Sequence, residues 1–103
     1  MEIQKVFLTS EFNSLDKETP FNTHTDVIVE LQNNEKFIAS FFTFQNITNI
    51  QQDHIKSGEF LRGKYFWSRN MILIDRCTRE NVMVVIKHLI EEGDFPLVFQ
   101  KLN

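Results

Sequence analysis

The sequence predicts a single α+β domain that spans residues 1–103, with a small antiparallel sheet and helices packed mainly on one face. Three patterns carry this prediction. Residues 26–44 alternate between apolar and polar side chains, as β-strands with one better-buried face do. Residues 71–75 begin with four consecutive apolar side chains, which is typical of a buried strand in a central position. Residues 79–92 repeat apolar side chains at helical spacing.

The stretch 26–44 is predicted to be a hairpin that turns at Asn33 and Asn34, since asparagine tolerates the positive φ of two-residue turns. This turn places Val29 opposite Ile38. Phe42 and Phe44 are then expected on the same face as that pair, and Ile28, Phe37, Ala39 and Phe41 on the opposite face. Both faces are therefore partly apolar, so either a chain segment or a partner is expected to cover the second one.

Two further stretches complete the predicted β part of the chain. Residues 3–8 are a candidate first strand, because apolar side chains dominate this short run. Residues 9–25 are polar, include Pro20 and show no sustained period, so we expect a loop there.

Three helices are predicted, over residues 46–57, 79–92 and 95–102. Asn46 or Thr48 can cap the first, and Gly58 stands where a glycine ends a helix. Thr78 is the expected N-cap of the second helix, and Gly93 its C-terminal stop.

Composition limits the environment and the function class. One cysteine, Cys77, cannot form a disulfide within the chain, and the first residues lack the basic start and apolar run of a signal peptide. The longest apolar runs are far shorter than a membrane-spanning helix. We therefore expect a cytoplasmic protein.

The net charge of −3 is unevenly distributed along the chain. Residues 1–53 carry three lysines against eight acids, whereas residues 54–79 carry six cations against two acids. This basic middle either binds anions or complements the acidic flanks within the same fold, and the second interpretation is favoured.

Aromatic and basic side chains alternate within the basic middle, and six of them form a candidate interaction surface: Arg62, Lys64, Tyr65, Phe66, Trp67 and Arg69. The favoured interpretation is that Phe66 and Trp67 close the core while the charged heads stay in water. Trp, Tyr and Arg together are also typical of protein–protein hot spots. A third use is to bind single-stranded nucleic acid or another polyanion through residues 56–79, although an acidic chain disfavours this.

Two weaker patterns could carry chemistry. His88, Glu91 and Glu92 share one helical surface at spacings that metal sites use, but they lack further ligands, so a solvated face is favoured and no metal is expected. Cys77 precedes a helix start beside Arg76, where amide dipoles and positive charge can lower a thiol pKa. A thiol-dependent enzyme is thus one alternative function, and small-residue filling the favoured interpretation.

The stretch from Lys64 to Ile74, the Thr78–Asn81 helix start and the Glu91–Phe95 ending together resemble short uncharacterised bacterial proteins. The resemblance centres on residues 37–99, and it implies no activity, cofactor or site.

No recognisable catalytic constellation, phosphate-binding loop or cofactor motif is present, so the sequence favours a non-enzymatic protein-interaction or regulatory module. A protein partner or self-association, such as a homodimer, is expected. Nucleic acid is the less favoured partner, and neither a cofactor, a membrane nor a small-molecule substrate is expected.

Overall fold

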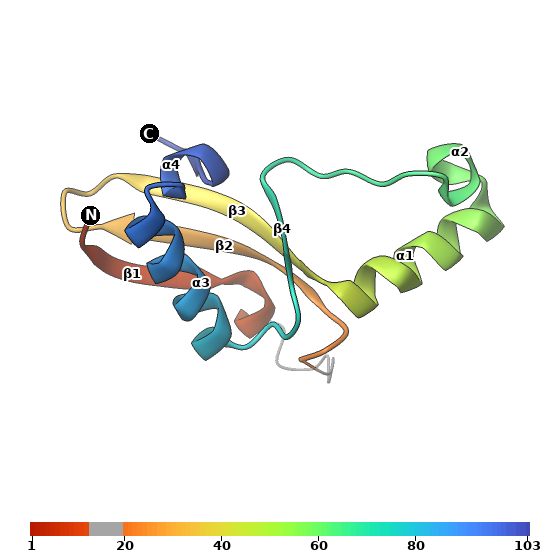
Figure 1. The fold of residues 1–103 in the computed structure, drawn as a ribbon, viewed down its shortest axis with the longest axis horizontal. Helices are drawn as coiled ribbons and strands as arrows, with labels where there is room; N and C mark the ends of the chain where they lie inside the picture. Colours follow the sequence, from red (N-terminus) through yellow and green to blue (C-terminus); the bar gives the residue numbers. More distant parts are fainter. Residues whose placement is uncertain (13–19) are drawn as a thin grey trace.

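A mixed β-sheet with two helices on one face forms the body of the molecule, and a helical arm extends from one end of the sheet (Figure 1). The computed structural model describes residues 1–12 and 20–103, so the middle of the predicted loop 9–25 lies outside the described residues. In chain order the elements are β1 (Ile3–Leu8), η1 (Thr9–Phe12), β2 (His24–Leu31), β3 (Lys36–Thr43), α1 (Phe44–Ser57), α2 (Glu59–Gly63), β4 (Met71–Ile74), α3 (Arg79–Glu92), α4 (Phe95–Val98) and β5 (Gln100–Lys101). These elements confirm the predicted α+β class.

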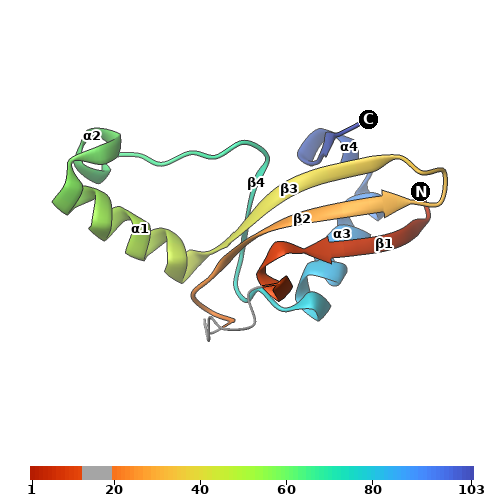
Figure 2. The same ribbon diagram turned by 180° about the vertical axis from the view of Figure 1, so that it is seen from behind.

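The sheet has the order β1-β2-β3-β4, with β5 paired to β3 beside β4. All pairs are antiparallel except β3 with β4, which run parallel. Parallel neighbours cannot be joined by a hairpin and need a long crossover. Here the crossover comprises α1, α2 and the connection over residues 64–70, and it projects beyond the sheet instead of lying on it (Figures 1 and 2).

The register of the central hairpin differs by one residue from the predicted one. Val29 lies opposite Phe37 and Ile28 opposite Ile38, because the chain turns through three residues, with Asn34 at φ 69°. The amide of Leu31 donates to the carbonyl of Glu35 at 2.9 Å and closes this loop. A one-residue shift moves every side chain of a strand to the other face.

The inner face of the sheet therefore holds the apolar residues that the shifted register brings together, and it forms the core: Val6, Leu8, Val27, Val29, Leu31, Phe37, Ala39, Phe41 and Ile74. Helix α3 covers this face with Val82 and Ile86, which are completely buried. Phe95 of α4 contacts Phe37 edge-on, with 5.1 Å between the ring centroids, and stacks on Phe99, with 4.5 Å between the ring centroids. Burying each such side chain contributes about 1.5–3 kcal/mol, so this layer supplies most of the stability.

The outer face of the sheet is partly apolar, as predicted, and in the described residues no helix covers it (Figure 2). It holds Phe7, Ile28, Ile38 and Phe42, of which Phe7 is the most exposed at 38%. The polar pair Asp26 and Ser40, joined at 2.8 Å, interrupts this apolar surface.

Strand β4 lies at an edge of the sheet, so its predicted central position is wrong. It pairs only with β3 among the described strands. Met71 and Ile72 are half-buried, and Leu73 is 42% exposed. An apolar run alone does not distinguish a central strand from an edge strand whose side chains face a neighbouring groove.

The predicted helix over residues 95–102 is also wrong in its length. It ends at Val98, and Phe99 adopts an extended conformation with ψ 139°. The last residues pair with the hairpin instead: the amide of Leu102 donates to the carbonyl of Lys36 at 2.7 Å, and Lys101 forms an ion pair with Glu35 at 2.6 Å. Tertiary pairing thus overrides the helical spacing of these apolar residues.

Candidate functional site

The arm is defined as residues 44–70, and the buried threonine that precedes it, Thr43, is the last residue of β3. The Thr43 hydroxyl accepts a hydrogen bond from the amide of Asn46 at 3.1 Å and caps α1, so the expected caps Asn46 and Thr48 are wrong. The same oxygen accepts from the amide of Thr23 at 3.2 Å. Gly58 ends α1 in the left-handed conformation, as predicted. Because α1 contains no buried residue, the arm has no hydrophobic core of the ordinary kind.

Helix α2 is a left-handed turn, which is rare for residues with side chains. Phe60, Leu61 and Arg62 have φ of 51°, 53° and 59°. Each such residue costs about 1–2 kcal/mol relative to the right-handed form. Strain of this kind persists only where surrounding contacts fix it, and it concentrates at functional sites. The turn points Phe60 into the arm and leaves Leu61 67% exposed at the tip.

An aromatic cluster inside the arm holds α2 and the connection against α1. Phe60 packs on His54 at 4.7 Å and edge-on against Phe66 at 5.3 Å. Phe66 also contacts Phe42 of the sheet edge-on at 5.6 Å. Phe66 is therefore half-buried and closes the arm onto the sheet, as expected for this ring. The same expectation is wrong for Trp67, which is exposed.

The two neighbours of Phe66 have a different environment. Tyr65 is 51% exposed and Trp67 is 61% exposed, although Tyr65 keeps an edge-on contact with Phe60 at 5.2 Å. The three cations of the candidate surface, Arg62, Lys64 and Arg69, are exposed as well. The structure thus places five of the six candidate residues in solvent and one in the cluster beneath them.

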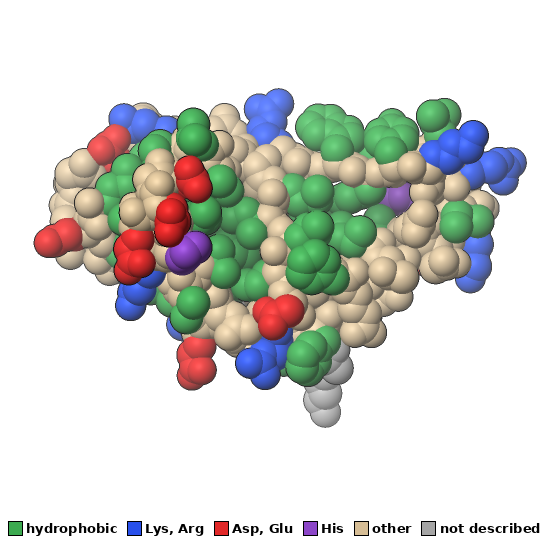
Figure 3. All heavy atoms as spheres, in the orientation of Figure 1, with side chains coloured by type: hydrophobic (Ala, Val, Ile, Leu, Met, Phe, Trp, Pro, Cys, Tyr) green, Lys and Arg blue, Asp and Glu red, His purple; other side chains and the backbone are tan. Residues whose placement is uncertain are grey.

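A groove of about 310 Å³, here called the arm groove, lies between α1, the connection and β4. It is lined by Ile47, Gln51, Gly63, Lys64, Tyr65, Phe66, Met71 and Leu73. The side-chain amide of Gln51 donates to the carbonyl of Gly63 at 3.1 Å and fixes the distance between α1 and the connection. In the space-filling view, hydrophobic side chains follow the connection, cations gather at the tip, and a hollow opens between the connection and α1 (Figure 3).

Two residues of the arm groove, Ile47 and Leu73, are not predicted from the sequence to line a surface. The sequence predicts Leu73 in a buried strand, and it assigns no functional role to Ile47 or to the exposed Leu61 at the tip of the arm. The only sequence signal for them was negative: α1 has too few apolar side chains to bury a face of its own against the sheet.

The environment of Cys77 differs from the electropositive one that the alternative of a thiol-dependent enzyme requires. Burial raises the pKa of this thiol to about 11, whereas the adjacent helix start and arginines had suggested a lowered value. Its amide donates to the carbonyl of Pro20 at 2.7 Å. A protonated thiol at neutral pH is a poor nucleophile, so this position fits structural filling.

His88, Glu91 and Glu92 all lie exposed on α3. Within residues 1–12 and 20–103, no three His, Cys, Asp or Glu side chains come together in a way that could hold a metal ion. In the same described ranges, no helix has both the length and the apolar character needed to cross a membrane.

Comparisons of the chain with protein-family models, with curated proteins and with solved structures find no match.

Proposed function

We propose that this protein is a non-enzymatic interaction module that binds a protein partner through the arm. The observation that carries the proposal is the exposure of two large rings of the connection, Tyr65, which lines the arm groove, and Trp67. Moving large exposed rings out of water is energetically favourable, and a partner can supply the apolar surface that covers them.

The binding surface of the arm is preorganised in the free protein. Phe66 and Phe60 hold the connection in place from inside, while the rings of Tyr65 and Trp67 stay outside. A rigid ring loses little conformational entropy on binding, since it has only two side-chain torsions. Each large ring can bury about 150–250 Å², so the two rings together supply a large part of one side of a small interface.

Charge favours an acidic partner surface. The arm carries Lys56, Arg62, Lys64 and Arg69 against Asp53 and Glu59, a net charge of +2, while the whole chain has −3. The positive charge of the arm steers an acidic patch toward it. The net negative charge of the whole chain disfavours unselective binding to polyanions.

The single cysteine, which has no disulfide partner in the chain, supports a reducing compartment such as the cytoplasm.

The test compares three forms of the intact protein as bait in extracts of the source cells. Trp67→Ala with Tyr65→Ala removes the proposed anchors, and Leu97→Ala removes an equally apolar side chain that is 80% exposed on α4, outside the arm. We expect the same protein partner to be retained by the wild type and by Leu97→Ala, and to be lost from the double variant. Retention by all three forms refutes the proposal.

Two parallel measurements separate the kinds of partner. Light scattering over a range of protein concentrations detects self-association, which the double variant should abolish if a second copy covers the rings. A titration with short single-stranded oligonucleotides at low and high salt detects polyanion binding. Saturable binding that weakens steeply with salt would assign the arm to nucleic acid and overturn the protein-partner proposal.

A further inference from the structure

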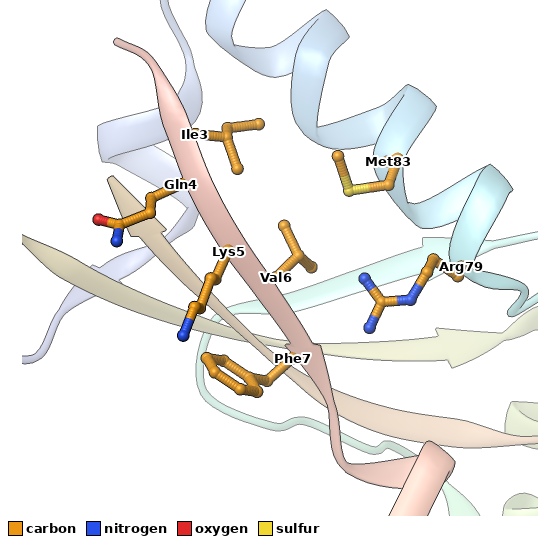
Figure 4. Close-up of a pocket in the computed structure, with 7 residues that line it drawn as sticks. All are labelled: Ile3, Gln4, Lys5, Val6, Phe7, Arg79 and Met83. Carbon is orange, nitrogen blue, oxygen red and sulfur yellow. The ribbon is translucent and has the colours of Figure 1, made fainter. Parts of the chain in front are cut away.

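Strand β1 forms the edge of the sheet opposite β4, and it pairs with β2 alone among the described strands. A groove of about 440 Å³, here called the edge groove, lies along this strand beside α3 (Figure 4). It is lined by Ile3, Gln4, Lys5, Val6, Phe7, Arg79 and Met83. None of these residues belongs to the arm, so this groove is separate from the arm groove.

The backbone of β1 presents hydrogen-bonding groups to this groove. The amide of Gln32 donates to the carbonyl of Glu2, so the even-numbered residues of β2 direct their backbone groups to β1. Lys5 and Phe7 lie opposite Glu30 and Ile28, so their backbone amides and carbonyls point toward β2. Backbone direction alternates along a strand, so the amide and carbonyl of Val6 point toward the open edge, where an added strand would pair.

Side chains divide the edge groove into two parts. Ile3 and Val6 lie toward α3, and Met83 reaches from α3 to meet them, which gives an apolar wall on the inner side (Figure 4). Gln4, Lys5 and Phe7 lie on the other side of the strand. An extended peptide alternates its side chains between the two sides, so apolar residues would face Met83 and the residues between them would face Lys5.

The charge of the groove lining selects which peptide residues can alternate with the apolar ones. Two of the seven lining residues are cations and none is a carboxylate. Arg79 already has an interaction within the molecule, so the selection of a charged ligand falls to Lys5. A carboxylate beside Lys5 gains an ion pair at the rim, whereas a second cation there is repelled.

A second copy of this chain is a poor occupant of the same edge. Lysine and a bulge are devices by which edge strands resist pairing with their own kind, and β1 has both, with the bulge between Ile3 and Lys5. Antiparallel pairing of two β1 strands about Val6 would also bring two Lys5 side chains to one side of the joined sheet.

We propose that the edge groove binds an extended segment of a partner protein, which adds to β1 as a further strand and alternates apolar with acidic side chains. The partner's main chain pairs with Val6, its apolar side chains contact Ile3, Val6 and Met83, and its carboxylates lie beside Lys5. This mode takes affinity from the main chain and selectivity from the alternating side chains.

The experiment titrates the intact protein with two fluorescein-labelled seven-residue peptides, one of alternating valine and glutamate and one of alternating valine and lysine, and follows anisotropy. We expect saturable binding of the glutamate peptide only. Lys5→Glu should weaken this binding about tenfold and improve binding of the lysine peptide. Lys87→Glu, an equal charge change on the exposed side of α3 outside the groove, should leave both affinities unchanged.

Amide hydrogen exchange locates the bound peptide, and exchange at Val6 should slow when the glutamate peptide is added. The inference is overturned if neither peptide saturates, if the two lysine variants behave alike, or if Val6 exchange is unaffected. It is also overturned if protection of Val6 rises with protein concentration in the absence of peptide, because a second copy then occupies the edge.

Discussion

Gly63→Ala tests the close approach of the end of α2 to α1, on which the shape of the arm groove depends. Gly63 has φ +76°, and a Cβ built there would lie 2.9 Å from the backbone oxygen of Gln51 and 3.0 Å from Cγ1 of Ile55. Gly58, only five residues earlier, has φ +87° and nothing within 4 Å of the same atom. The two glycines therefore share a backbone conformation and differ in the space around them.

The magnitudes follow from these two differences. An alanine in the left-handed region costs about 1–2 kcal/mol at either position. At Gly63 the added carbon must also displace a helix backbone, and overpacking of this kind costs about a further 1–3 kcal/mol. We expect Gly58→Ala to destabilise the arm by about 1–2 kcal/mol and Gly63→Ala by about 2–5 kcal/mol.

The assay is native-state hydrogen exchange followed by mass spectrometry, with peptides that cover α1, the connection and the sheet. Because α1 has no buried residue, we expect the arm to open without the sheet, so the loss should show in arm peptides first. A difference of 1–3 kcal/mol between the variants corresponds to arm exchange about 5 to 150 times faster in Gly63→Ala than in Gly58→Ala.

Equal exchange in the two variants would refute the reasoning, since it would mean that the end of α2 does not approach α1 closely at Gly63. Faster exchange across β2 and β3 as well would show that the arm and sheet unfold as one unit, so that the arm is not a surface that forms separately.

Three further predictions concern single positions. Thr43→Val keeps the buried shape but removes an oxygen that accepts from two backbone amides, so urea unfolding should show a loss of about 2 kcal/mol, against about 1 kcal/mol for Thr78→Ala, which removes only a cap. The pKa of Cys77 is about 11 when folded, against an ordinary value near 9, so the thiol should react with iodoacetamide more slowly than glutathione at pH 8. Stability should also fall between about pH 9 and 11 as the unfolded thiol ionises first, and Cys77→Ala should reduce that fall; an unchanged fall contradicts the assignment. Leu61→Gly relieves a left-handed residue with an exposed side chain and should not destabilise the protein, whereas Gln52→Gly in the right-handed α1 should cost about 1 kcal/mol by the same urea assay.

Features controlled by neighbouring residues were predictable from the chain. Thr78 caps α3 and Gly58 and Gly93 end their helices in the left-handed conformation, as expected, because each signal acts within one helical turn. The apolar stripe of α3 and the strands of the hairpin were predictable for the same reason. A helix or strand period is already present in the order of the side chains.

Register and edge position were not predictable in this way. The hairpin loop has three residues instead of two, and only the pairing of β2 with β3 selects between them. Gln100 and Lys101 form a strand because the hairpin offers them a pairing partner in β3, with further contacts to Lys36 and Glu35. The contact that decides the chain end joins Leu102 to Lys36, far apart in sequence, whereas the hairpin loop is decided by the pairing of Leu31 with Glu35 across the turn. Apolar spacing carries no record of either pairing.

The candidate site shows the same division most clearly in three adjacent rings. The sequence alone identified Tyr65, Phe66 and Trp67 as a cluster next to cations, but the same residues suit a core or a surface. The parallel pairing of β3 with β4 forces a crossover, and the crossover leaves the sheet as an arm with no core to receive all three rings. Phe66 therefore turns inward against Phe60, while its two neighbours remain in solvent. Residue type determined that large rings had to be accommodated here, and the path of the chain between two distant strands determined which of them a partner can reach.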